Sequence, residues 1–303
     1  MHLMALTNEQ VIDIAKKHGL KILPESLNPN ESGLDFQVVF AKDLKGENWV
    51  LRFPRREDVL PNAKKEKQIL DLIEPRMSVQ APVWEVFSDE IIAYRLLKGT
   101  PTGTIDTDAG AYVWKIDEKN VPDTYHDTLA RTMVSLHHID HEEARQAGLS
   151  VLGPEELKSS MKERMEKMKA AFGVGEALWS RWQTWLDNES IWPKQTALIH
   201  GDLHAGHILI DHEARVTGLI DWTEARVDDP AHNFGVHLTL FGEEALKKLI
   251  QSYQNAGGYV WRGMYEHIKE VVATYPIAVA EFAIVSGLKE YEDMARQMLG
   301  VEK

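Results

Sequence analysis

The stretch from Leu198 to Trp222 constrains this chain more than any other part of its sequence. Its first half places four polar side chains within eight residues: His200, Asp202, His204 and His207. Its second half contains two short apolar runs separated by a charged turn, which is the pattern of a β-hairpin, and Asp221 follows the second run. We therefore expect Asp202, His207 and Asp221 to converge at one end of the hairpin, where paired strands would hold them in place.

Three interpretations of this stretch compete. The histidines could form a buried cluster that only satisfies the hydrogen bonds of the loop. His200, His204 and His207 could instead bind the metal of a hydrolase, because their spacing suits metal ligands. A phosphotransferase could use Asp202 as its base, because protein kinases place a metal ligand five residues after the base and a metal-binding acid further on. The stretch alone leaves all three open.

Length, composition and charge limit the classes of protein. The chain has 303 residues, no cysteine and a net charge of −13. Without cysteine it has neither disulfides nor thiolate metal sites, which suits a cytoplasmic protein. Its negative charge argues against nucleic acid or an anionic membrane as a partner and favours a cationic substrate, and no apolar run approaches the roughly 18 residues of a membrane helix. A nucleoside triphosphate would need local cations, from Arg, Lys or magnesium, to be bound.

The first hundred residues predict a small β-rich lobe. A capping box at Thr7 opens a helix, and a second helix is expected at 61–74. Strands are expected at 34–41, 49–53, 82–87 and 91–97. The loop at 30–33 is interpreted as lying between two strands, so a further strand is expected before it and the lobe should have five strands.

Arg52 is a lone cation in an apolar strand of this lobe, and two roles are open to it. It could extend along the sheet edge to solvent, or it could reach phosphates, with Glu66 of the following helix as its partner. The break after Leu97 is the expected boundary between a lobe of residues 1–97 and a lobe of residues 98–303.

Beyond residue 98 the sequence is mostly helical. Helices are expected at 122–139, from 155 onward, at 230–240, 243–255, 264–274 and 277–299. Met161, Met165, Met168 and Phe172 recur at helical spacing and are interpreted as core. The whole predicts an α+β, bilobal protein-kinase-like fold, because the order of cation, glutamate, connecting segment, base and metal ligands is that of a kinase.

These parts together resemble the aminoglycoside phosphotransferase superfamily and, more narrowly, the macrolide 2′-phosphotransferases. The resemblance rests on five pieces in order: Asn30–Gln37, Trp49–Arg56, His200–His207, Gly218–Ala225 and Tyr275–Gly287. It implies a magnesium-dependent enzyme that transfers the γ-phosphoryl group of GTP, or of ATP, to the 2′-hydroxyl of a macrolide's amino sugar. The alternatives are an aminoglycoside or small-metabolite kinase of the same fold, a metallohydrolase, and an inactive nucleotide-binding protein.

The resemblance also implies roles for residues. Asp202 would accept or orient the hydroxyl proton, and His207 and Asp221 would hold the divalent metal. Arg52, fixed by Glu66, would contact phosphate oxygens. The superfamily usually has Asn where this chain has His207 and often Lys where it has Arg52; since magnesium prefers oxygen ligands, the imidazole puts the metal preference in doubt.

The remaining implied contacts concern the nucleotide. Ser32 and its loop backbone would close over the phosphates. The base would lie against the connector and hydrogen-bond its backbone around Tyr94, Arg95 and Leu96. His200 and His204 would support the loop and would not bind metal.

The acceptor site is predicted in the stretch from Tyr275 to Val285, which has one acid in eleven residues. A macrolide is a large lactone ring with one amine on its sugar, so its pocket should be a broad apolar wall. Ala278 and Ala283 would leave room for the ring beside Tyr275 and Phe282, unless this helix is simply core. A monomer is expected.

Overall fold

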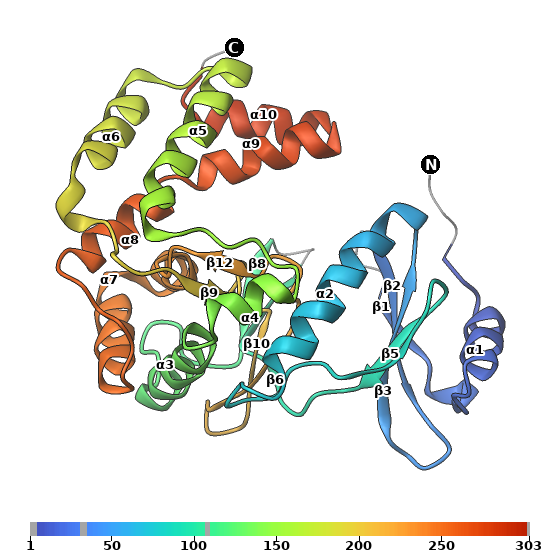
Figure 1. Cartoon of the computed structure of the whole chain (residues 1–303). Helices are drawn as coiled ribbons and strands as arrows, with labels where there is room; N and C mark the ends of the chain where they lie inside the picture. The colour runs from blue at the N-terminus through green and yellow to red at the C-terminus, as the bar shows by residue number, and fades with distance from the viewer. Residues whose placement is uncertain (1–4, 31–34, 107–109, 302–303) are drawn as a thin grey trace.

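The computed structural model describes residues 5–30, 35–106 and 110–301, and it confirms the α+β, kinase-like arrangement expected from the sequence (Figure 1). The predicted small β-rich lobe is a five-stranded antiparallel sheet. In spatial order its strands are β1 (Asn28–Asn30), β2 (Phe36–Lys42), β3 (Asn48–Pro54), β5 (Ile92–Arg95) and β4 (Trp84–Phe87).

The side chains of β3 alternate between the two faces of this sheet. Trp49, Leu51 and Phe53 belong to an apolar cluster with residues of α1 (Asn8–Lys17). Val50 belongs to the larger cluster that includes α2 (Leu60–Ile73). Because neighbouring residues of a strand point to opposite faces, Arg52 lies on the same face as Val50, toward α2.

The C-terminal lobe carries three small sheets. β6 (Thr100–Pro101) pairs with β10 (Ile208–Ile210), which pairs with β11 (Val216–Leu219). Two further antiparallel pairs are β9 (Ala197–Ile199) with β12 (Arg226–Asp228), and β7 (Gly103–Asp106) with β8 (Ala111–Trp114). The expected boundary after Leu97 thus falls between strands of different sheets, and the division into residues 1–97 and 98–303 stays a prediction.

Helices make up most of this lobe (Figure 1). They are α3 (Asp123–His137), α4 (His141–Gln146), α5 (Pro154–Phe172), α6 (Glu176–Asp187), α7 (His232–Asn255), α8 (Met264–Val272), α9 (Tyr275–Ser286) and α10 (Lys289–Met298). Short 3-10 turns occupy Pro24–Ser26, Glu57–Val59 and Glu189–Ile191. The methionine stripe of α5 is buried, as predicted. No helix in the described ranges is long and apolar enough to cross a membrane.

One helix prediction needs correction. The single helix expected at 277–299 is two helices, α9 and α10, because Gly287 adopts a left-handed conformation with φ of +64° and ends α9. The two helices expected at 230–240 and 243–255 are confirmed as the two arms of α7, which meet at Gly242, whose φ of +81° is not helical. The β7–β8 hairpin and α4 were not predicted.

Candidate active site

The stretch from Leu198 to Trp222 folds into a tight loop and a hairpin. The loop follows β9, and His207 immediately precedes β10. The Ile220 N–H donates to the His207 carbonyl at 3.1 Å, so Asp221 returns to the same end of the hairpin. His207 Nδ1 lies 3.6 Å from Asp202 Oδ2, and His207 Nε2 lies 3.6 Å from Asp221 Oδ2. The structure therefore brings these three side chains together.

Two unusual backbone conformations shape this site. Gly201 has φ of +87°, and a Cβ there would lie 2.3 Å from the Glu224 carbonyl oxygen, so only glycine fits before Asp202. Asp221 has φ of +63°, a left-handed conformation that is uncommon for a residue with a side chain. Strain of this kind is found where the surrounding structure fixes a functional group.

His200 supports the loop from inside the protein. It is fully buried, and its Nε2 lies 3.0 Å from the Ile220 carbonyl, while its Nδ1 accepts the Asp202 N–H at 3.3 Å. Burial and the neighbouring His207 ring lower the pKa of His200 to about 3, so its ring stays neutral. Both ring nitrogens are thus engaged, which leaves His200 no lone pair for a metal.

The other two histidines differ in which ring nitrogen is free. His207 Nδ1 lies 2.9 Å from the Asp202 carbonyl, which can only accept, so Nδ1 carries the hydrogen. The lone pair of His207 is then on Nε2, facing Asp221. His204 Nδ1 accepts the Gly206 N–H at 3.0 Å, so the hydrogen of neutral His204 is on Nε2.

These assignments decide which residues could hold a cation. Asp202, His204 and His207 offer ligand atoms within 4.8 Å of one another, but His204 has its lone pair engaged. His207 Nε2 and Asp221 Oδ2, 3.6 Å apart, are both acceptors, and a divalent cation with bonds of about 2.1 Å would fit between them. The donor set therefore fits a metal bound by one nitrogen and one carboxylate.

A buried ion pair borders this end of the hairpin. Arg52 Nη1 donates to both carboxylate oxygens of Glu66 at 3.0 Å, and Glu66 is 1% exposed. Burial raises the pKa of Glu66, while Arg52 acts to lower it and nearby Asp221 raises it further. Burial also acts to raise the pKa of Asp221, but His207, Thr223 and Arg52 outweigh it and hold that pKa below its usual value. Asp221 is thus a carboxylate beside a fixed cation.

The sequence matches the model of the phosphotransferase enzyme family over residues 26–267. The chain belongs to this family. Over 97% of its length it superposes on 98% of macrolide 2′-phosphotransferase MphH from Brachybacterium faecium, with a TM-score of 0.91 and 32% identity. A macrolide 2′-phosphotransferase type I superposes over the full length of both chains, with a TM-score of 0.89 and 35% identity. The uncharacterized protein YcbJ of Bacillus subtilis (strain 168) is 43% identical over 96% of this chain and 95% of its own.

In this phosphotransferase the connector residues are partly engaged by the fold. Tyr94 is buried in β5, and Arg95 pairs with Asp43 and Glu85 and stacks on Trp49 at 3.9 Å. The Leu96 N–H donates to the Asn48 carbonyl at 2.9 Å, so a nucleobase would have to use other backbone groups of the connector. Ser32 lies outside the described residues.

The predicted acceptor residues share one helix face. Tyr275, Ala278 and Phe282 are all exposed, and their spacing of three and four residues places them on one side of α9. Ala283, expected beside them, is buried instead. Glu281 is held by two hydrogen bonds of 2.9 and 2.7 Å from Arg164, so the one acid of this stretch is paired.

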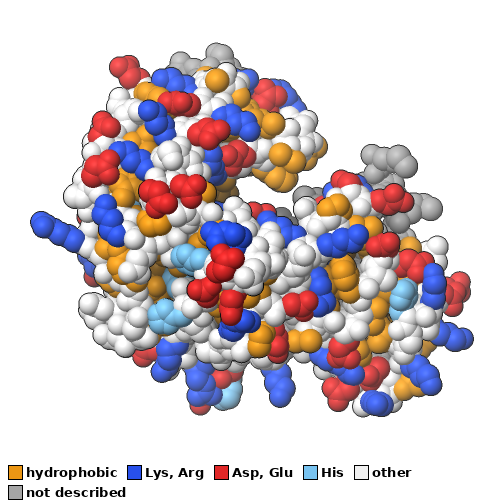
Figure 2. Space-filling view, in the orientation of Figure 1, with side chains coloured by type: hydrophobic (Ala, Val, Ile, Leu, Met, Phe, Trp, Pro, Cys, Tyr) orange, Lys and Arg blue, Asp and Glu red, His pale blue; other side chains and the backbone are white. Residues whose placement is uncertain are grey.

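A hollow separates the two lobes in the space-filling view (Figure 2). Hydrophobic side chains cover the tip of the C-terminal lobe that borders it, where Figure 1 places α9 and α10. On the face of α9 that also carries Ala278, the exposed large hydrophobic residues are Tyr275 and Phe282. This surface is apolar and open to a large molecule.

Sequence reasoning missed Tyr112, on β8. Burial raises the pKa of Tyr112, and Asp202 raises it further. The Gly103 N–H of the same hairpin donates to the Ala205 carbonyl at 3.2 Å, so the hairpin lies against the loop that carries Asp202. The Tyr112 ring stacks on Trp114 at 4.7 Å, and a Cβ on Gly103 would strike the Trp114 ring at 2.7 Å. The signal available in the sequence was the alternation of Tyr112 and Trp114, which is typical of a strand with one aromatic face.

Sequence reasoning also missed two groups that hold the site from behind. Gln80 accepts the Lys98 N–H and donates to the Thr217 carbonyl, which ties the connector to β11. Asn233 accepts the His200 N–H at 3.1 Å, and its amide lies 3.0 Å from His137 Nε2. Neither residue stands out in the sequence, because their partners are far along the chain.

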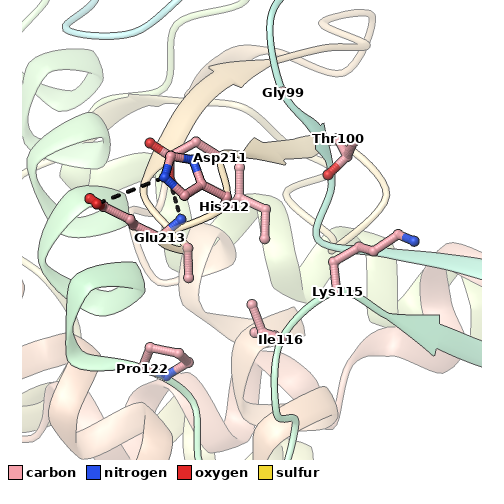
Figure 3. A pocket seen from close by; sticks show the side chains of 10 residues that line it. Gly99, Thr100, Lys115, Ile116, Pro122, Asp211, His212 and Glu213 are labelled. Atoms are coloured by element: carbon pink, nitrogen blue, oxygen red, sulfur yellow. Dashed lines mark hydrogen bonds and ion pairs between the residues drawn. The ribbon is translucent and has the colours of Figure 1, made fainter.

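A separate cavity of about 810 Å³ lies at the other end of the hairpin (Figure 3). It is lined by Thr100 of β6, by Lys115 and Ile116 after β8, and by His212 and Glu213 of the turn after β10. Asp202, His207 and Asp221 do not line it. The cavity is therefore distinct from the end of the hairpin where these three side chains meet.

Proposed function

We propose that this phosphotransferase transfers the γ-phosphoryl group of GTP, or of ATP, to the 2′-hydroxyl of a macrolide's amino sugar and so inactivates the antibiotic. The observation that carries the proposal is the exposed apolar face of α9, on which Tyr275, Ala278 and Phe282 lie together. The full-length similarity to two macrolide 2′-phosphotransferases, at 32% and 35% identity, supports the same acceptor. The nucleotide preference follows from the resemblance alone.

Asp202 is proposed to accept or orient the proton of the acceptor hydroxyl. Its side chain is 48% exposed, so a hydroxyl can approach it, while its backbone N–H and carbonyl are held by His200 and His207. The loop thus fixes the backbone and leaves the carboxylate open, which is the arrangement that a general base requires.

His207 and Asp221 are proposed to bind a divalent metal, for which the family resemblance implies Mg²⁺, and this metal would neutralise phosphate charge when bound. Arg52 is proposed to contact phosphate oxygens, because Glu66 orients its guanidinium toward the same end of the hairpin. Such fixed positive charge matters here, since the whole chain carries −13. Ser32 and the connector around Tyr94, Arg95 and Leu96 stay the proposed neighbours of the nucleotide.

The acceptor is proposed to be apolar because of what α9 exposes. Aminoglycosides are polycations, and a pocket for them needs several free acids. Glu281 is the single acid between Tyr275 and Val285, and Arg164 already pairs with it. Tyr275, Ala278 and Phe282 instead offer apolar area, worth about 25 cal/mol for each Å² that a macrolide would cover.

The test is nucleotide consumption by the purified enzyme with GTP and with ATP, against a panel of macrolides and aminoglycosides. Erythromycin-like compounds should be phosphorylated at the sugar hydroxyl, as located by mass spectrometry and NMR, and faster with GTP. Faster turnover of kanamycin-like compounds would favour the alternative, an aminoglycoside or small-metabolite kinase of the same fold. Equal rates with both nucleotides at limiting concentration would remove the GTP preference alone.

A further inference from the structure

We propose that the cation site formed by His207 and Asp221 selects Mn²⁺ over Mg²⁺, and that the His207 imidazole is the selecting group. This inference rests on the proposed function, because the metal would arrive with the nucleotide. It concerns which ion the site prefers, whereas the proposed function requires only that a divalent ion is bound.

The His207 ring is held in one orientation. Its side chain is 15% exposed, and its Nδ1 donates to the Asp202 carbonyl at 2.9 Å. The His204 ring lies against it, with 3.8 Å between ring centroids. Turning the ring to present carbon to the cation would break the Nδ1 hydrogen bond inside a packed loop. Nε2, 3.6 Å from Asp221 Oδ2, is therefore the atom that a cation meets.

The chemistry of that nitrogen decides the preference. Mg²⁺ takes oxygen ligands almost exclusively and gives up its water reluctantly. Imidazole binds first-row transition metals more strongly than it binds Mg²⁺. Among those metals, Mn²⁺ is the one that otherwise takes the same carboxylate, phosphate and water oxygens as Mg²⁺. A site with one imidazole and one carboxylate therefore favours Mn²⁺ relative to a site in which both protein ligands are oxygens.

His204 provides a matched control. It lies beside His207 and close to Asp202, but its Nδ1 accepts the Gly206 N–H and its Nε2 carries the hydrogen. If the cation instead used Asp202, His204 and His207 together, His204 would contribute to selectivity as much as His207. A site made of His207 and Asp221 and a site made of Asp202, His204 and His207 thus make opposite predictions for a His204 variant.

The experiment measures Mn²⁺ binding by electron paramagnetic resonance of the free ion, with the enzyme saturated by a non-hydrolysable GTP analogue. Mg²⁺ is then added to displace Mn²⁺, which gives the ratio of the two affinities. The ratio is measured for the wild type, His207→Asn and His204→Asn. Thermal unfolding of each variant in the same buffer verifies that it is folded.

Asparagine replaces the ring nitrogen of His207 by an amide oxygen, so His207→Asn should lower the Mn²⁺-to-Mg²⁺ affinity ratio by at least roughly tenfold. His204→Asn should leave the ratio within about twofold of the wild type. An unchanged ratio in a folded His207→Asn protein would overturn the inference, as would an equal loss in His204→Asn. Neither result would touch the proposed function, which is judged separately by phosphorylation of the macrolide.

Discussion

The Arg52 guanidinium, on β3, and the Glu66 carboxylate, on α2, share two hydrogen bonds of 3.0 Å. The Glu66 side chain is 1% exposed and that of Arg52 15%, so the pair joins the sheet to α2 largely away from water. Removing one partner leaves a buried charge without compensation. Glu66→Gln should therefore lower the free energy of unfolding by roughly 3–5 kcal/mol, measured by urea denaturation. Glu85→Gln, at an exposed ion pair of Arg95, serves as the control and should change little; equal effects would contradict this role.

Asp202→Asn tests the proposed base. The backbone of Asp202 keeps its bonds to His200 and His207 in this variant, so the fold should be unchanged. The amide cannot accept a proton, and turnover should fall by at least roughly 10²-fold. Steady-state kinetics at saturating nucleotide, with the melting temperature as a check of folding, measures this. A rate near that of the wild type would remove Asp202 from the mechanism.

Asn233 should act on the site through His200. Its Oδ1 accepts the buried His200 N–H at 3.1 Å, and Asn233→Ala would release the loop that carries Asp202. We expect turnover to fall by up to roughly 10²-fold with little change in the KM for nucleotide. Asn233→Asp keeps the acceptor oxygen and should recover part of the rate. A variant that loses only stability, with turnover of the folded protein unchanged, would show that Asn233 is structural.

Ala278→Trp tests the acceptor surface. Ala278 lies between Tyr275 and Phe282 on the exposed face of α9, so an indole there should obstruct a macrolide without disturbing the core. Macrolide turnover should fall while nucleotide binding, measured by calorimetry, is unchanged. Ile284→Trp is the control: Ile284 is 50% exposed and, nine residues after Tyr275, points to the other side of the helix. Equal losses in both variants would argue against this face as the acceptor site.

Buried histidines should make stability depend on pH. Burial lowers the pKa of His137, His200 and His237 to about 3, and that of His126 to about 4, from 6.5. The unfolded chain therefore binds more protons between pH 6.5 and 3, so stability is complete above pH 6.5 and falls as pH decreases through this window. At pH 5.5 each of these histidines should lower the free energy of unfolding by about 1 kcal/mol relative to pH 7.5, as measured by urea denaturation at the two pH values. His212→Gln, at an exposed histidine, should leave this slope unchanged, and a flat profile in the wild type would contradict the prediction.

The sequence alone determined the local patterns. The apolar runs around the turn after Ile210 predicted the hairpin, and the spacing of Asp202, His207 and Asp221 predicted that they meet at one end of it. The Arg52–Glu66 pair followed from a lone cation in a strand and an acid on the next helix. These inferences succeed because the period of a strand or helix fixes which side chains share a face.

Only the tertiary structure decided what depends on partners distant in the chain. Which nitrogen of His207 faces Asp221 is set by one hydrogen bond to the Asp202 carbonyl, and spacing cannot give it. The β7–β8 hairpin, which carries Tyr112, lies against the loop of Asp202 because the Gly103 N–H donates to the Ala205 carbonyl. Ala283 was expected beside the acceptor but is buried, since the hydropathy of α9 is nearly uniform and packing alone chose its exposed face. Contacts of this kind come from the assembled core, where each position depends on all its neighbours.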